Sequence, residues 1–204
     1  QLEELLNKFA KKGRPGLPKN IAISWIRYDQ PNPDPCSGIG AGWAEQKLLY
    51  PASVVKLAYA LATEAWLQKD LLLDSAELQR AVKDMIADSS NDATSLVIDL
   101  LSGTTSGPSL FGERWQAWQK QRLIVNEWLY SLNWPELKGI NCCQKTWGEG
   151  PYGREQDFYK DGYVNRNSLS TSATARILEA VMTNGAISPP ACKRLRTLLS
   201  RSLD

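Results

Sequence analysis

A serine and a lysine three residues apart are the first residues of this sequence that could carry out chemistry. They are Ser53 and Lys56, within the stretch 51–56 (PASVVK). Residues i and i+3 of a helix share a face, so these side chains can meet if a helix begins here. A serine hydroxyl needs a base to become a nucleophile, and a lysine among apolar neighbours has a lowered pKa that suits this role. The alternative is a helix-capping serine beside a lysine that extends into solvent.

The chain contains no histidine, which narrows the chemistry further. A Ser-His-Asp triad, a Cys-His pair and a His-ligated zinc site are all excluded. Any nucleophilic catalysis must therefore use Lys, Asp, Glu or Tyr as its base, and this favours Lys56. We expect no metal and no cofactor. Four cysteines lack the spacing of a zinc site and are expected to be buried or free thiols; they are Cys36, Cys142, Cys143 and Cys192.

A second motif, Ser89-Ser90-Asn91, follows within the stretch 85–101 (MIADSSNDATSLVIDLL). Taken alone, Ser89 and Asn91 are typical of a polar helix cap. An SxxK motif followed by S-x-N, however, resembles the penicillin-recognising serine enzymes, which include class A β-lactamases and penicillin-binding proteins. The resemblance covers most of the chain. It is strongest over residues 20–60 and 85–101, moderate over 165–202 and poor over 105–165.

The resemblance implies a role for each of these residues. Ser53 would attack a lactam, amide or ester carbonyl, and its N–H would form half of an oxyanion hole. Lys56 would accept the hydroxyl proton or hold the nearby charge, Ser89 would pass a proton to the leaving nitrogen, and Asn91 would bind the substrate's side-chain amide. The implied function is hydrolysis of a β-lactam or related amide through an acyl-enzyme. A DD-peptidase, an esterase, a serine-dependent glutaminase and a non-catalytic penicillin-binding sensor remain alternatives.

Two further elements of that family have only weak candidates in this sequence. The third family motif is Lys-Thr-Gly on a late strand, and Lys145-Thr146 is a candidate at a different position in the order. The glutamate that activates the deacylating water has Glu136 as its candidate, with Glu149 and Glu155 weaker. If none of them serves, we expect slow turnover of the acyl-enzyme. The resemblance favours a periplasmic or secreted location, although no signal peptide is visible.

The elements that must position these residues follow from hydrophobic spacing and turn signals. Strands are expected over 21–29 and 42–50, with a loop over 30–40. Helices are expected over 1–12, 53–68, 75–87, 92–101, one or two within 109–132, and 172–183 and 189–202, with mainly loop over 133–168. The order predicts an α+β fold of the β-lactamase/transpeptidase-like type in one domain, 1–204. Residues 1–52 and about 165–204 would form a lobe with an antiparallel sheet, and 53–164 a mainly helical lobe.

Composition limits the partners. The chain has 24 basic and 22 acidic residues, with no block of like charge, and this argues against nucleic acid as a partner. No apolar run approaches the ~20 residues that span a membrane. The expected partner is a small-molecule substrate: a lactam, amide or peptide. A two-stranded sheet by itself is only marginally stable, so we also expect a second chain or a further C-terminal segment to complete the sheet.

Overall fold

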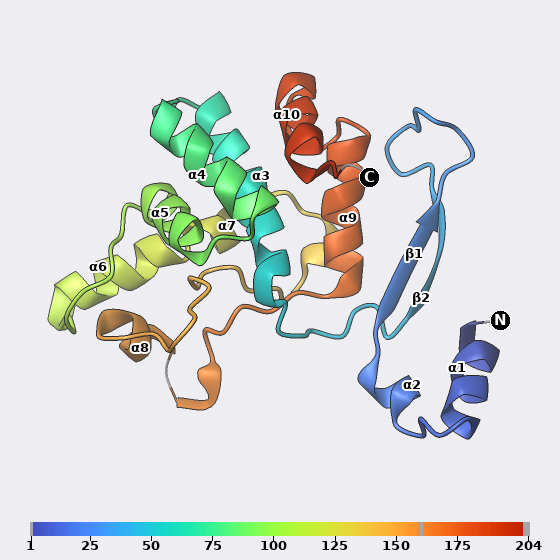
Figure 1. Cartoon of the computed structure of the whole chain (residues 1–204). Coiled ribbons are helices and arrows are strands. Elements are labelled where there is room, and N and C mark those ends of the chain that lie inside the picture. The colour runs from blue at the N-terminus through green and yellow to red at the C-terminus, as the bar shows by residue number, and fades with distance from the viewer. Residues whose placement is uncertain (1, 160, 202–204) are drawn as a thin grey trace.

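The structure, a computed structural model, describes residues 2–159 and 161–201 and is α+β, with mostly helices and one small antiparallel sheet (Figure 1). The first elements are α1 (Leu2–Lys11), α2 (Leu17–Asn20), β1 (Ile23–Arg27), β2 (Ile39–Trp43), the 3-10 turn η1 (Ala52–Val55) and α3 (Lys56–Gln68). Next come α4 (Ala76–Ala87), α5 (Asn91–Ser102), α6 (Gly112–Arg122), α7 (Ile124–Ser131) and η2 (Pro135–Leu137). The last are α8 (Arg154–Tyr159), η3 (Asp161–Tyr163), α9 (Thr171–Met182) and α10 (Pro189–Leu199).

The sheet pairs β1 with β2, with Ile23 opposite Trp43. The expectation of a second strand over 42–50 is therefore wrong, because the pairing ends at Trp43. Ala44 follows with a left-handed φ of 46°, which turns the chain out of the strand. The strand instead includes residues assigned to the loop, among them Gly40. A Cβ at Gly40 would lie 2.7 Å from the main-chain oxygen of Trp25, so this register needs glycine.

Helix α9 packs against β1 and lies between the sheet and the central helices (Figure 1). The hydroxyls of Ser24 and Thr171 share a hydrogen bond of 2.9 Å, and the main-chain N–H of Cys36 donates to Glu179 Oε1 at 2.7 Å. Trp25 and Ile39 of the sheet remain largely exposed. The sheet has two strands in the described part of the chain, and the expected additional partner stays a prediction.

Helix α3 is the centre of the core and is buried from Lys56 to Trp66. A helix that is apolar on all sides needs neighbours on all sides, and α4, α5, α7 and α10 supply them (Figure 1). The few polar groups on α3 have partners. Tyr59 Oη, for example, donates to the main-chain oxygen of Gln144 at 2.7 Å. The helix that carries Lys56 is thus fixed on every side.

The expected helices all form, with small shifts at their ends. Ser75 caps α4 by accepting a hydrogen bond from Leu78 N at 3.2 Å. The six-residue helix α8 was not expected, because it is too short to show a hydrophobic period. Within the stretch 133–168, expected to be mainly loop, Asn141 forms an isolated antiparallel bridge with Ser168. None of the helices within the described ranges has the length and apolar character needed to cross a bilayer.

Candidate active site

Ser53 lies in η1, the turn that continues directly into α3. The residue before it, Ala52, has a left-handed φ of 46°, and such a conformation in a residue other than glycine costs about 1–3 kcal/mol and is concentrated at functional sites. The turn leaves the Ser53 side chain exposed to solvent. The N–H of Val54 already donates to the main-chain oxygen of Pro51 at 3.0 Å, so the Ser53 N–H, at the positive end of the helical run, is the group that can stabilise an oxyanion beside the Ser53 hydroxyl.

Lys56 Nζ brings all four predicted site residues together. It lies 3.2 Å from Ser53 Oγ, 3.0 Å from Ser89 Oγ and 3.0 Å from Asn91 Oδ1, and donates to the main-chain oxygen of Ser89 at 2.5 Å. Lys56 is only 2% exposed, whereas Ser53, Ser89 and Asn91 are exposed. The site therefore combines a buried amine with hydroxyls that a substrate can reach.

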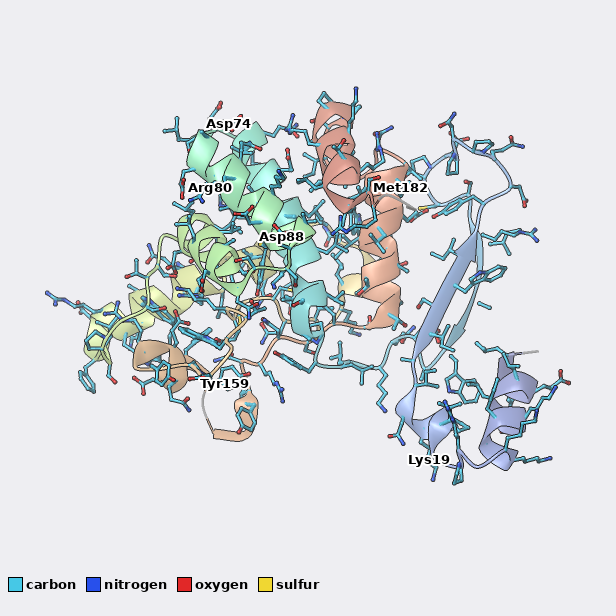
Figure 2. The ribbon with its side chains drawn as sticks, viewed as in Figure 1. Lys19, Asp74, Arg80, Asp88, Tyr159 and Met182 are labelled. Carbon is cyan, nitrogen blue, oxygen red and sulfur yellow. The ribbon has the colours of Figure 1, made fainter. Side chains whose placement is uncertain are left out.

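The turn between α4 and α5 carries Ser89 and Asn91 to Lys56, and both of its sides are anchored. Ser89 itself has a left-handed φ of 55°. Ser90 caps α5, because its hydroxyl accepts from Ala93 N at 3.2 Å, while its own N–H donates to the main-chain oxygen of Asp84 in α4 at 3.1 Å. Figure 2 labels Asp88, the last residue before this turn, beside α3. Ser89 and Asn91 are the residues that the sequence indicates as a helix cap, whereas the residue that caps α5 is Ser90.

Burial lowers the pKa of Lys56, because the charged ammonium loses its water without gaining an opposite charge. No carboxylate forms an ion pair with Lys56 within residues 2–159 and 161–201. An ammonium has three hydrogens for the four acceptors around it, whereas a neutral amine has two hydrogens and one lone pair. The two carbonyl oxygens, of Ser89 and of the Asn91 side chain, can only accept. In the neutral amine they take both hydrogens, and the lone pair is left for a hydroxyl proton, as a general base requires.

A cavity of about 370 Å³ opens at these residues. Its lining comes from η1, α3, α4, α9, α10 and the α4–α5 turn. The lining residues are Ser53, Val54, Lys56, Leu57, Met85, Ile86, Ser89, Thr174, Leu178 and Leu199. Sequence reasoning missed Thr174, Leu178 and Leu199, since nothing in their helical spacing separates a cavity wall from ordinary core.

The candidates for the remaining family elements lie elsewhere. None of Glu136, Glu155, Lys145 and Thr146 lines the cavity beside Ser53. Glu136 instead borders a different cavity, 4.0 Å from Arg176 Nε. The expectations that Glu136 or Glu155 activates a water at Ser53, and that Lys145-Thr146 replaces the third motif, are not supported by these positions. Glu149, the other weak candidate, is exposed and also absent from the lining.

Lys145 and Glu155 belong to a buried ionic cluster in the helical part of the molecule. Lys145 Nζ lies 2.7 Å from Asp99 Oδ2 and donates to Ser106 Oγ at 2.8 Å, and Arg122 pairs with Glu155 at 2.6 Å. Both side chains of the second pair are fully buried. Charges in such a place need partners, so this cluster holds the loop around Lys145 against α5 and α6.

All four cysteines are free thiols, with Cys36 exposed and the other three buried, as expected. The described residues contain no group of three or more side chains that could hold a metal ion. No known protein-family model matches the chain, and no curated protein matches it. Its function must therefore be inferred from the four side chains and the cavity beside them.

Proposed function

We propose that this protein is a serine hydrolase that acts through an acyl-enzyme on a β-lactam or a related amide. Ser53 is the nucleophile and Lys56 its base. The observation that carries the proposal is the contact of 3.2 Å between the buried Lys56 amine and the exposed Ser53 hydroxyl. Chance proximity explains it poorly, because Ser89 and Asn91 reach the same amine from another helix pair.

We also propose that the fold is of the β-lactamase/transpeptidase-like type, with a sheet lobe and a helical lobe. Two observations support this assignment. Two antiparallel strands precede the helix of the SxxK motif, and that helix is buried between helices from both parts of the chain. Of the S-x-N motif, Ser89 lies on the turn before α5 and Asn91 is the first residue of α5, and both contact Lys56.

Acylation begins with Lys56 neutral. Its lone pair accepts the Ser53 hydroxyl proton as Oγ bonds to the substrate's carbonyl carbon, and the carbonyl electrons move to oxygen. The new oxyanion lies near the Ser53 N–H, at the start of the helical run. The new ammonium is stabilised by the main-chain oxygen of Ser89 and by Asn91 Oδ1, which already accept from the amine. The protein thus holds both charges that the step creates.

The proton held by Lys56 then passes to the leaving group. Ser89 Oγ, 3.0 Å from Lys56 Nζ, can pass the ammonium proton to the departing nitrogen as the carbon–nitrogen bond breaks. Deacylation reverses these roles: Lys56 accepts a proton from water, the hydroxide attacks the ester carbonyl, and Ser53 leaves with the proton. Since no carboxylate lines the cavity among the described residues, Lys56 serves in both halves of the reaction. This single base predicts slow deacylation.

The experiment is intact-protein mass spectrometry of the full chain after mixing with a fluorescent penicillin and, separately, with 4-nitrophenyl acetate. We expect an added acyl mass in the wild-type protein and none in Ser53→Ala. Turnover of a chromogenic cephalosporin is followed in parallel. Turnover that needs Ser53 identifies a lactamase, and a lasting lactam adduct without turnover identifies a DD-peptidase or penicillin-binding sensor. Absence of both an adduct and turnover with folded wild-type protein contradicts the proposal.

A further inference from the structure

We infer that the natural substrate is an uncharged lactam, amide or ester with an apolar acyl group, rather than a compound with a carboxylate beside the scissile bond. This inference rests on the proposed function and names the substrate of that site. It comes from the lining of the cavity beside Ser53, which is apolar on several sides and offers few partners for a negative charge.

The apolar part of the lining comes from four separate elements and the turn before α3. Leu57, Met85, Ile86 and Leu199 form the inner walls. Val54 and Leu178 also line the cavity and are more exposed, at 48% and 39%. Exposed leucines are ordinary when scattered, but here two exposed apolar side chains from η1 and α9 border one cavity that also contains a nucleophile. Binding sites for small molecules have this composition, with an apolar lining and few polar groups.

The charges around the cavity disfavour an anionic ligand. Lys56 is the only charged residue among the described residues that line it, and four oxygen acceptors already surround its amine. Arg201 lies nearby, since it donates to the main-chain oxygen of Ile86 at 2.8 Å, but it also donates to the main-chain oxygens of Leu198 and Ser200. A carboxylate in this cavity would lose water without gaining an unoccupied cation, and such a transfer is unfavourable.

The size of the cavity sets the size of the acyl group. Its volume of about 370 Å³ is more than twice the ~150 Å³ of an apolar protein cavity that binds benzene. A ring or an acyl chain of several carbons therefore fits. Burial of one methylene is worth up to about a fourfold gain in kcat/KM. We expect kcat/KM to rise with acyl length until the cavity is filled.

The test uses the full chain and 4-nitrophenyl esters of acetate, butanoate and hexanoate, together with the 4-nitrophenyl half-ester of succinate. The half-ester has the same number of acyl carbons as butanoate but ends in a carboxylate. We expect kcat/KM to increase from acetate to hexanoate. We also expect the half-ester to react at least ~10-fold more slowly than butanoate, because its charge has no free partner.

A charge introduced in the lining of the cavity provides the decisive variant. Leu178→Lys places a cation at the cavity and should raise the ratio of half-ester to butanoate kcat/KM by about tenfold. The matched control is Leu73→Lys, which adds the same charge between α3 and α4, at a leucine that is 84% exposed and does not line this cavity. It should leave the ratio unchanged. Thermal melts of both variants check that they fold.

The outcomes separate this inference from the proposed function. If the half-ester or a penicillin reacts with Ser53 faster than butanoate, the proposed function stands and the inference is wrong. An unchanged ratio in a folded Leu178→Lys variant also overturns it. If no ester and no lactam modifies Ser53 at all, the proposed function is wrong and the inference is wrong with it.

Discussion

Replacing Lys56 by arginine keeps a positive charge in the site but removes the base. The guanidinium cannot be deprotonated in a protein, so it has no lone pair to accept the Ser53 proton. Lys56→Met removes both the base and the charge. A comparison of the two variants therefore separates proton transfer from simple charge stabilisation at Ser53.

The expected magnitude follows from the geometry. The Lys56 amine lies 3.2 Å from Ser53 Oγ, at the outer limit of the distance at which a base accepts a proton directly. General base catalysis of this kind contributes roughly 10²–10⁴ in rate, which corresponds to about 3–5 kcal/mol of activation free energy. We expect both variants to acylate at least ~100-fold more slowly than the wild-type protein.

The assay is the burst of 4-nitrophenol from 4-nitrophenyl acetate, measured as a function of pH. In the wild-type protein the acylation rate should rise with pH as Lys56 loses its proton and then reach a plateau. Because burial lowers the pKa of Lys56, this plateau should begin below the range near 10.5 in which an ordinary lysine titrates. Both variants should lose this dependence on pH.

The same group links pH to folding. Between the lowered pKa of folded Lys56 and the ordinary value of the unfolded chain, the unfolded state binds more protons. The contribution of Lys56 to the free energy of unfolding therefore rises with pH across this window and is constant and unfavourable below it.

A Lys56→Arg variant that acylates at the wild-type rate with the wild-type pH profile would refute the assignment of Lys56 as base.

Three other predictions concern the surroundings of the site. Ser90→Ala and Ser75→Ala each remove an N-cap hydrogen bond of 3.2 Å and should each lower the free energy of unfolding, measured in urea, by about 1 kcal/mol. Only Ser90→Ala should also slow acylation, because Ser90 anchors the turn that carries Ser89. Equal effects of the two variants on acylation would contradict this account of the turn. Glu155→Gln removes a charged partner of the buried Arg122 and Lys145 and should lower the free energy of unfolding by about 3–5 kcal/mol. Glu136→Gln removes only an ion pair of 4.0 Å with Arg176 and should lower it by less than about 1 kcal/mol in the same assay. Iodoacetamide at pH 8 should add one label to the native protein, at Cys36, and should label the three buried cysteines only after unfolding. Labelling of a buried cysteine in the native protein would show that the helix or loop that contains it opens.

The sequence predicted the SxxK contact because it is local. Residues three apart at the start of a helix must share a face, so Ser53 and Lys56 had to be neighbours if α3 formed. The meeting of Lys56 with Ser89 and Asn91 spans more than thirty residues. No periodicity determines such a contact, and only the resemblance of the paired motifs suggested it.

Other parts of the fold depend on tertiary contacts that a single sequence does not reveal. The second strand was misplaced because Gly40 and its neighbours read as turn, although close approach to Trp25 requires glycine there. The pairing of Lys145 with Asp99 was not expected either, because the two residues are far apart in the sequence. Leu178 was predicted to lie on a helix, but its position beside Ser53 follows from how α9 packs.

The most direct test concerns which serine is the nucleophile, because Lys56 Nζ contacts the hydroxyls of both Ser53 and Ser89. The full chain is treated with a small neutral fluorophosphonate, digested and sequenced by tandem mass spectrometry. We predict a phosphonylated Ser53, retained in Ser89→Ala and lost in Lys56→Met over the same reaction time. Modification at Ser89, or equal modification in Lys56→Met, would contradict the assignment of Ser53 as a nucleophile activated by Lys56.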